Sequence, residues 1–414
     1  MLMLTGTPPG TANVGEIILR DLSLHYGPSK IQCIAVVPPG YCSQSDERLK
    51  GLSIEFLTSI HIHAQRWSEA AWGALGSLAN YLVGFRREVA RLVDEIVRKA
   101  DATQPEVVFA VLNNPLMMSV GYRVARVLGR PLVTLVWDPP EYLAKLSRFD
   151  RWSRRLLLKE FRRSLASSRS VAVVSAAMQQ DYALLTSASV QILRHGMVMQ
   201  FPSGFAPGAA FEGDEWVIGF AGSMYSNCAW GALLKALDQA NWSIAGRPVR
   251  LKVMGAQMAV SSSTAAQVEF LGFRPPEQVQ SILARCHLNY MPQPFVPQLA
   301  ALCRYAFPTK LTNYLAVGRP VFVHAPGDGA LSHFFEANPI GARANTLDPE
   351  QILSVLETLL GDERAYHDAC RQVRATAIRH FDVSVFHKAI DELFEASQDG
   401  RSASSALPME AVAR

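Results

Sequence analysis

The chain has 414 residues, a length that predicts two domains rather than a single hydrophobic core. Hydrophobic residues make up 49% of it and charged residues 18%, as in globular proteins, and a net charge of +4 is too small to indicate a nucleic-acid-binding protein. No apolar run approaches the roughly 20 residues of a membrane span and the N-terminus lacks a signal-peptide pattern, so we expect a cytoplasmic protein.

Short apolar runs alternate with longer helical patterns in the first half of the chain, which is typical of a parallel α/β domain. The run PLVTLVW is apolar at both alternating positions, as expected for a parallel strand covered on both faces. A helix is expected after Asn13, because the apolar residues that follow share one helical stripe. The strands expected in this half are Met1–Thr5, Ile31–Val37, Val107–Leu112, Pro131–Trp137 and Ser170–Val174.

A stretch rich in Gly, Pro and small residues interrupts this alternation at 201–215 and is interpreted as an interdomain linker. Strand patterns restart after it in the runs WVIGFAG, RLKVMGA, VEFLGF, LNYMP and RPVFVHA. The expected organisation is one Rossmann-like domain at 1–200 and a second at 216–383. A C-terminal helix at 384–396, which can pack back on the first domain, and a disordered tail at 397–414 follow.

The segment Phe307–Ala325, FPTKLTNYLAVGRPVFVHA, is the most informative part of the chain. Pro308 suits the first position of a helix, and Gly318 ends that helix before a buried strand. Lys310 then lies in the first turn, where the helix dipole disfavours a cation by roughly 0.3–1 kcal/mol unless an anion shares the site. An ammonium group at a helix N-terminus suits a pyrophosphate, but a Lys310 side chain pointing into solvent is an equal alternative.

This segment resembles the donor-binding helix of GT-B glycosyltransferases, especially family 4 of bacterial sugar transferases. In that family a Pro-x-Lys or Gly-Phe-Gly element precedes a Glu-x-Leu/Met-Ala-x-Gly-x-Pro-Val run. WVIGFAGSMY is similar to the family's first donor-domain strand and phosphate loop, and LKVMGA, VEFLGF and the C-terminal helix follow in the family's order. The resemblance covers nearly the whole chain. It implies two Rossmann-like domains facing across a cleft, an acceptor-side domain at 1–200 and a nucleotide-sugar donor domain at 216–383.

The resemblance also implies residues of a donor site. Lys310 would contact the donor diphosphate, and Gly222 and Ser223 would belong to the phosphate loop, where Ser223 replaces the family's usual Arg. Phe273 and Arg274 would line the base pocket, although an ordinary strand exit with a solvated Arg274 is the alternative.

The family typically has two glutamates separated by seven residues, and in this register Tyr305 and Asn313 take their places. Asn313 can still accept a hydrogen bond from the donor ribose, but without charge assistance. Thr309 is assigned to the same donor site. Because neither glutamate is present, the resemblance does not settle whether the reaction retains or inverts the anomeric configuration.

The first half of the chain contains candidates for the acceptor side. Asp138 closes a buried strand and could deprotonate an acceptor hydroxyl in an inverting reaction. Asp-Pro-Pro-Glu is also a good helix start with Asp138 as N-cap, and we favour this structural role. Gly10, Gly15 and Asn114 lie in loops after strands and could approach a phosphate or the acceptor, but ordinary turns explain them equally well.

Nothing in the sequence favours a metal site or a cofactor. His61 and His63 alternate on a possible strand without further ligands nearby, and the six cysteines contain no CxxC pair. His195 precedes Gly196 at the linker and is expected to serve the hinge. No metal is expected, because protein cations and helix dipoles can neutralise a leaving diphosphate.

A basic amphipathic helix is expected at 144–169, suited to an anionic membrane surface. The alternative is a solvated helix whose apolar stripe, which includes Phe149 and Trp152, packs on the sheet. The residues expected to contact the membrane are Lys145, Arg148, Arg151, Arg154 and Arg155.

Together these features predict a glycosyltransferase that moves a sugar from a nucleotide-sugar donor to a glycan or lipid-linked acceptor in bacterial polysaccharide or glycolipid synthesis. It would be cytoplasmic or peripheral at the inner membrane. Two alternatives remain open: a nucleotide-sugar epimerase of the same fold, or a non-catalytic sugar-nucleotide-binding partner of a synthase complex.

Overall fold

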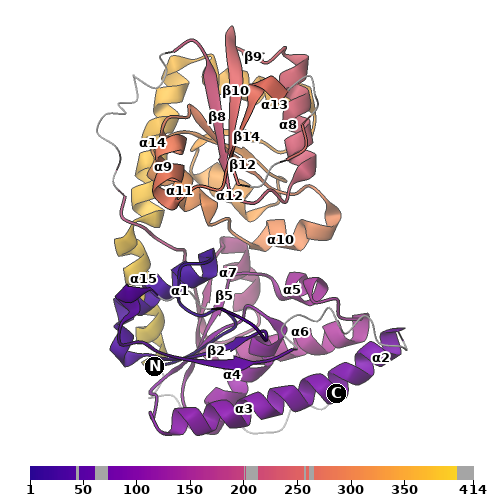
Figure 1. Cartoon of the computed structure of the whole chain (residues 1–414), viewed down its shortest axis with the longest axis vertical. Helices are drawn as coiled ribbons and strands as arrows, with labels where there is room; N and C mark the ends of the chain where they lie inside the picture. The colour runs from indigo at the N-terminus through magenta and orange to yellow at the C-terminus, as the bar shows by residue number, and fades with distance from the viewer. Residues whose placement is uncertain are drawn as a thin grey trace. The chain divides into compact units, whose positions relative to one another are not determined.

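The computed structural model describes residues 1–42, 46–60, 73–199, 201, 213–255, 258–260 and 265–398. Two compact units make up the chain (Figure 1). Unit 1 consists of Met1–Val173, Met178–Leu193 and the chain from His387 onward, and unit 2 consists of Val174–Ala177 and Arg194–Phe386. Most of the expected linker, the tail beyond Gln398 and the pair His61 and His63 lie outside the described residues.

Unit 1 is built on a parallel sheet with the strand order β3-β2-β1-β4-β5-β6-β7. Its central strands are buried along their whole length, since helices cover both faces of the sheet. The strands are β1 (Leu2–Thr5), β2 (Gln32–Val37), β3 (Ser53–Thr58), β4 (Val108–Val111), β5 (Leu132–Val136), β6 (Ser168–Val173) and β7 (Ser189–Ile192).

The helices of unit 1 follow from local capping and apolar periodicity. Asn13 is the N-cap of α1, because its side-chain oxygen accepts from the Glu16 N–H at 3.1 Å, and the Glu16 carboxylate accepts from the Asn13 side-chain amide at 2.9 Å. The helices are α1 (Val14–Tyr26), α2 (Gly73–Asn80), the π-helical turn η4 (Tyr81–Phe85), α3 (Arg86–Asp101), α4 (Pro115–Leu128), α5 (Pro140–Leu146), α6 (Arg151–Ala166) and α7 (Ala176–Ala183).

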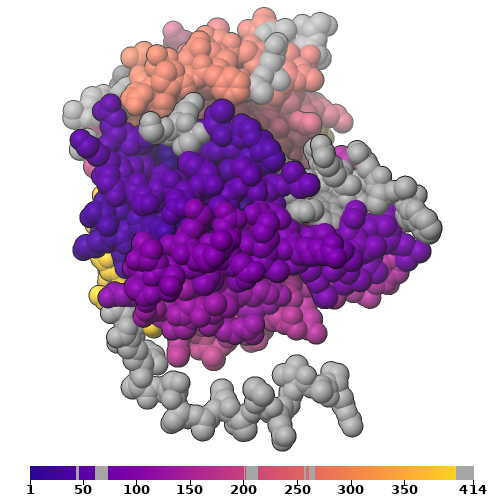
Figure 2. All heavy atoms as spheres, turned by 60° about the horizontal axis from the view of Figure 1, so that its bottom comes forward, coloured from indigo at the N-terminus to yellow at the C-terminus, as the bar shows by residue number. Residues whose placement is uncertain are grey.

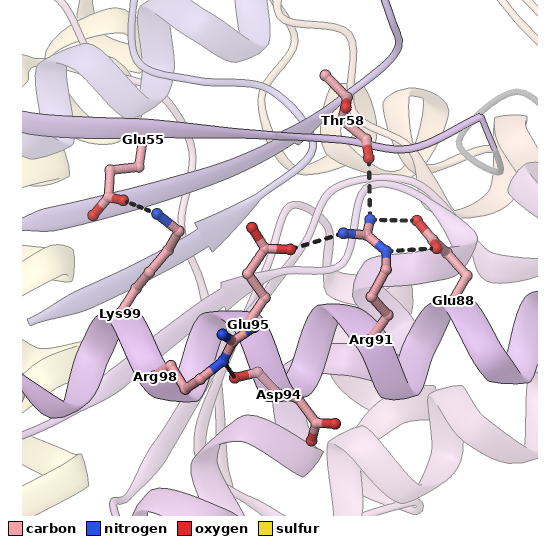
Figure 3. Close-up of polar contacts among 8 residues, drawn as sticks. All are labelled: Glu55, Thr58, Glu88, Arg91, Asp94, Glu95, Arg98 and Lys99. Carbon is pink, nitrogen blue, oxygen red and sulfur yellow. Dashed lines mark hydrogen bonds and ion pairs between the residues drawn. The ribbon is translucent and has the colours of Figure 1, made fainter.

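Ion pairs connect α3 to the edge strand β3 (Figure 3). Lys99 contacts Glu55 of β3 at 2.6 Å, and Arg91 donates to the carbonyl oxygen of Thr58 at 3.1 Å. Arg91 also pairs with Glu88 and Glu95 of its own helix, each at 2.7 Å. Figure 2 shows α3 in purple across the front of unit 1. The edge strand is thus held by charged groups that also keep this face polar.

Unit 2 contains a second sheet, with the parallel order β11-β10-β8-β12-β13-β14 and the short β9 antiparallel to β10. Its strands are β8 (Trp216–Ala221), β9 (Ser243–Ile244), β10 (Arg247–Met254), β11 (Val268–Gly272), β12 (Leu288–Pro292), β13 (Val321–His324) and β14 (Gly341–Ala344). Its helices are α8 (Asn227–Gln239), α9 (Pro276–Ala284), α10 (Ala300–Tyr305), α11 (Lys310–Ala316), α12 (Ala330–Ala337), α13 (Pro349–Leu360) and α14 (Glu363–Phe381). Two parallel α/β units confirm the fold class expected from the sequence.

The last helix, α15 (Val383–Gln398), begins in unit 2 and continues in unit 1. Within unit 1, Phe394 lies with its ring centroid 5.0 Å from that of Tyr26 and 5.6 Å from that of Phe109. The Ser170 hydroxyl donates to the carbonyl oxygen of Leu393 at 2.7 Å. The C-terminal helix is therefore part of the unit 1 core.

The expected single helix at 144–169 is wrong, because the chain forms α5 and α6 with a break between them. Arg148 in the break has a positive φ of 53°, and Asp150 caps α6 by accepting from the N–H groups of Trp152 and Ser153. Phe149 is buried against Tyr81 and Phe85 and is not available to a membrane. Of the helices in the described ranges, none is both long and apolar enough to cross a bilayer.

Candidate donor site

Three glycines end three neighbouring strands of unit 2 at the carboxyl edge of the sheet. The strand β8 is followed by Gly222, β10 is followed by Gly255, and β11 ends at Gly272. All three glycines have a positive φ, at 102°, 123° and 66°. The Gly222 N–H donates to the Met254 carbonyl oxygen at 2.8 Å, and the Gly255 N–H donates to the Gly272 carbonyl oxygen at 2.9 Å. A Cβ on Gly255 would lie 2.5 Å from the Gly222 carbonyl oxygen. The glycines therefore permit a close backbone approach at the edge where parallel sheets bind ligands.

Lys310 lies against this glycine edge. Its ammonium donates to the Ser223 carbonyl oxygen at 2.5 Å and lies 4.8 Å and 5.2 Å from the ring centroids of Phe220 and Tyr225. A Cβ on Gly222 would come within 2.8 Å of the Lys310 Cε. The alternative of a Lys310 side chain that points into solvent is therefore wrong.

The helix that contains Lys310 starts later than expected. Thr309 is the N-cap and Lys310 the first residue of α11, so Pro308 precedes the helix instead of opening it. The Pro308 carbonyl oxygen still accepts from the Leu311 N–H at 3.1 Å, as in a tight first turn.

The Lys310 ammonium lacks an acidic partner among the ion pairs of the described residues. Burial lowers the pKa of Lys310 to about 8, and it is the one cause of the shift. A desolvated cation without a counter-charge is costly unless an anion binds beside it. Gly222 and Ser223 are exposed next to it, so the arrangement is suited to an anion such as a phosphate.

Hydrogen bonds fix the loop that follows β8. The Tyr314 hydroxyl, buried on α11, accepts from the Ala221 N–H at 2.8 Å. Ser226 donates to the Gln293 carbonyl oxygen at 2.5 Å, and the Gln293 amide donates to the Tyr225 hydroxyl at 3.3 Å. The loop is thus held to α11 on one side and to the end of β12 on the other.

Several of these contacts involve residues that the sequence did not single out. Gly255 follows a strand that was expected, and a glycine directly after a buried strand could have identified it. Tyr225, Gln293 and Tyr314 have no such local pattern, because their importance depends on contacts between distant segments. Arg194 is also new: it lies with its guanidinium carbon 4.0 Å from the Phe307 ring centroid, and burial lowers its pKa to about 10.

The structure brings only some of the expected donor residues together. Gly222 and Ser223 contact Lys310 directly, whereas Asn313 is exposed one turn later on α11. Phe273 directly follows Gly272 and is 83% exposed, and Arg274 donates to its carbonyl oxygen at 3.1 Å. An exposed aromatic ring beside the glycine edge is compatible with stacking on a base.

Tyr305 and Thr309 lie between α10 and α11. Tyr305 is half-buried at the end of α10, with the Arg304 guanidinium carbon 5.3 Å from its ring centroid. Thr309, also half-buried, is the residue before Lys310 and adopts helical backbone angles. Nothing in these contacts assigns either residue to a ligand.

The acceptor-side candidates of unit 1 lie where loops lead into helices, and their polar groups are engaged within the protein. The Gly10 N–H donates to the Glu16 carbonyl oxygen at 3.1 Å and is therefore engaged within the protein. Asn114 is buried and caps α4 by accepting from the Met117 N–H at 2.9 Å. A Cβ on Gly15 would lie 3.4 Å from the Trp137 ring, so this helix start packs closely against the residue before Asp138.

Asp138 is not the helix N-cap that the sequence favoured. The N-cap of α5 is Pro139, and no side chain caps the helix, because the chain turns into the helix one residue after Asp138. Burial raises the pKa of Asp138 to about 6. A carboxyl group with a raised pKa is better matched to proton transfer near neutral pH than an ordinary aspartate.

Asp138→Asn is expected to stabilise the protein at pH 7 by about 3 kcal/mol and to have little effect below pH 4. Burial of the ionised carboxylate opposes folding, and this cost grows as the pH rises from the unfolded pKa near 3.8 to the folded pKa near 6. Urea unfolding of both proteins across this pH range measures it. A constant difference between them at all pH values would show that Asp138 is not desolvated.

The structure offers no metal centre among the described residues, where no cluster of three or more His, Cys, Asp or Glu side chains is suited to a metal ion. His195, at the start of unit 2, has its ring centroid 5.5 Å from that of Phe386. Its carbonyl oxygen accepts from the Thr312 hydroxyl of α11 at 3.4 Å.

Comparison with known proteins shows the fold. No family model and no curated protein matches the chain. Its structure is similar to that of HepE from Anabaena in complex with UDP, at 18% identity and a TM-score of 0.62, over 96% of this chain and 100% of that chain. Sucrose-phosphate synthase from Thermosynechococcus elongatus matches at 11% identity and a TM-score of 0.66, over 95% and 98% of the two chains. The lipopolysaccharide outer core galactosyltransferase WaaB matches at 11% identity and 0.62, over 96% and 99%. The resemblance to GT-B glycosyltransferases is confirmed at the level of structure, and the chain has the GT-B fold.

Proposed function

We propose that this protein is a glycosyltransferase that uses a nucleotide-sugar donor. The observation that supports it best is Lys310, a desolvated cation without an acidic partner in the described residues, held against the exposed backbone of Gly222 and Ser223. Similar structures were solved with UDP, with UDP and glucose, and with UDP-glucose. All three are structures of HepE, and each contains UDP or a UDP-sugar.

In this proposal the chain stabilises the leaving diphosphate. The Lys310 ammonium would contact a phosphate oxygen and neutralise the charge that develops as the glycosidic bond breaks. The fixed loop after β8 would present its backbone N–H groups without reorganisation. Asp138 would accept the proton of the acceptor hydroxyl if the configuration is inverted.

The acceptor we propose is a glycan or a lipid-linked molecule in bacterial polysaccharide or glycolipid synthesis. The exposed basic residues Lys145, Arg148, Arg151 and Arg155 would bring unit 1 to the anionic inner membrane, whereas Arg154 is partly buried. One lipopolysaccharide galactosyltransferase among the similar structures agrees with this choice.

A non-catalytic sugar-nucleotide-binding partner is the second candidate, because the resemblance implies that Tyr305 and Asn313 replace the family's two glutamates. Incubation of the full chain with a panel of nucleotide-sugars, with and without lipid-linked acceptors, distinguishes the alternatives. A transferase releases the nucleoside diphosphate when an acceptor is added. An epimerase converts the donor sugar without releasing nucleotide, and a binding partner gives calorimetric heat without turnover.

Asn313→Ala is expected to weaken binding of UDP by about fivefold while leaving kcat nearly unchanged. The reason is that a ribose hydrogen bond is made equally in the ground state and in the transition state. Calorimetric titration with UDP and steady-state kinetics measure the two quantities. If UDP binds the variant as tightly as wild type, the assignment of Asn313 to the donor ribose fails.

A further inference from the structure

The helical segment formed by α2 and η4, Gly73–Phe85, contains no charged residue and exposes an apolar face on the part of the chain that the structure describes. Leu75 is 66% exposed, Val83 is 50% exposed, and Leu82 between them is exposed as well. Figure 1 shows α2 and α3 as parts of one long helix, and the exposed residues lie in its first half. A soluble helix normally turns aliphatic side chains inward, so an uncovered row of them indicates a binding surface.

The opposite side of this segment is firmly packed. The Ser77 hydroxyl donates to the Asp150 carboxylate at 2.7 Å, and Tyr81 and Phe85 stack at 4.9 Å between ring centroids. Both rings meet Phe149 edge-on, at 5.8 Å and 6.0 Å. Because the segment is anchored at the start of α6, the outward direction of Leu75 and Val83 is a fixed property of unit 1.

Basic residues follow the apolar row in the chain and are also exposed at the corner that anchors it. Arg86 and Arg87 follow it directly and are exposed, and the α5–α6 corner to which it is anchored exposes Lys145, Arg148 and Arg151. The nearby acids are already engaged. Asp150 accepts from Ser77 and caps α6, and Glu88 pairs with Arg91 at 2.7 Å (Figure 3). The same corner exposes Leu146 and Trp152, a residue type that favours membrane interfaces.

We propose that the Gly73–Phe85 segment inserts Leu75, Leu82 and Val83 into the headgroup region of an anionic bilayer, with Arg86 and Arg87 directly after it at the phosphates. Exposed aliphatic side chains followed directly by exposed arginines match a surface that is apolar inside and negative outside. This inference deepens the membrane contact under the proposed function: it adds an inserted apolar element to a contact that was purely electrostatic. It does not depend on which sugar is transferred.

The test is co-sedimentation of the full chain with phosphatidylcholine vesicles, with and without phosphatidylglycerol, across a salt series. The triple variant Leu75→Ser, Leu82→Ser, Val83→Ser is expected to lower vesicle binding by at least about tenfold, even at high salt. A charge-only contact would vanish at high salt in wild type as well, because salt screens it. Val127→Ser on α4 removes an equally exposed aliphatic side chain elsewhere and serves as the matched control.

Two outcomes would overturn the inference. One is binding to anionic vesicles by the triple variant that equals wild type at every salt concentration. The other is a wild-type dimer in analytical ultracentrifugation that the triple variant abolishes, since a second copy would then cover the row. UDP binding by both proteins without vesicles is measured in parallel. If wild type does not bind UDP, the result contradicts the proposed function and not the membrane inference. If the triple variant still binds UDP, its fold is intact.

Discussion

Lys310→Ala is expected to lower kcat/KM for the nucleotide-sugar roughly 30- to 1,000-fold, which is a loss of about 2–4 kcal/mol of transition-state stabilisation. The ammonium is desolvated between Phe220 and Tyr225 and adjoins the exposed loop of Gly222 and Ser223. Its removal takes away the positive charge that opposes the leaving diphosphate. Steady-state kinetics with the full chain and the preferred donor measure the loss.

The pH dependence of donor binding gives a second measurement on the same residue. Because burial lowers the Lys310 pKa to about 8, wild-type affinity for UDP is expected to fall as the pH rises above 8. The Lys310→Ala variant should lack this pH dependence. Lys235→Ala, at an exposed position on α8, is the control and should behave like wild type. A kcat/KM for Lys310→Ala within about twofold of wild type would place Lys310 outside the site.

Gly255→Ala is expected to lower the free energy of unfolding of unit 2 by about 3–5 kcal/mol and to weaken UDP binding. Its φ of 123° is strained for any residue with a Cβ, and that Cβ would lie 2.5 Å from the Gly222 carbonyl oxygen. Relief of the clash must displace the loop that Lys310 contacts. Urea unfolding followed by far-UV circular dichroism measures the stability, and calorimetry measures the binding.

Gly231→Ala is the matched control for this substitution. Gly231 lies inside α8 with nothing within 4 Å of an added Cβ, so alanine should stabilise the helix by up to about 1 kcal/mol. If Gly255→Ala unfolds at the same urea concentration as wild type, the close approach of the two loops does not exist.

The strands that could be predicted from the sequence are those with all-apolar cores. The runs around β5 and β8 are largely apolar at odd and even positions alike. This is the pattern of a strand that is buried on both faces of its sheet, as both strands are. The edge strands β3, β7 and β14 were missed, because exposed or half-buried positions interrupt their apolar pattern, and the two-residue β9 was missed as well. Several strand limits were displaced by one or two residues: the expected Pro131–Trp137 is Leu132–Val136, and the expected Ser170–Val174 is Ser168–Val173.

The site was predictable only where chemistry is local. Lys310, Gly222 and Ser223 follow from a helix start and a strand end, and the structure brings them into contact. Asp138 was favoured as a helix cap because Asp-Pro-Pro-Glu fits that motif, but the helix begins at Pro140 and the carboxylate is left buried. Whether a side chain is desolvated depends on its three-dimensional neighbours, which a sequence pattern does not contain.

The course of α15 has a consequence for the order in which a growing chain can fold. Phe394 packs against Tyr26 and Phe109, and Leu393 accepts the hydrogen bond of Ser170, so part of the unit 1 core comes from α15, which follows nearly all of unit 2 in the chain. Unit 2, Arg194–Phe386 with Val174–Ala177, ends within the first turn of α15, so it is synthesised before the part of the helix that contains Leu393 and Phe394. The first unit to be translated is thus the last to close its core, and a fragment that ends at Leu193 leaves Phe109 and Tyr26 without their aromatic partner.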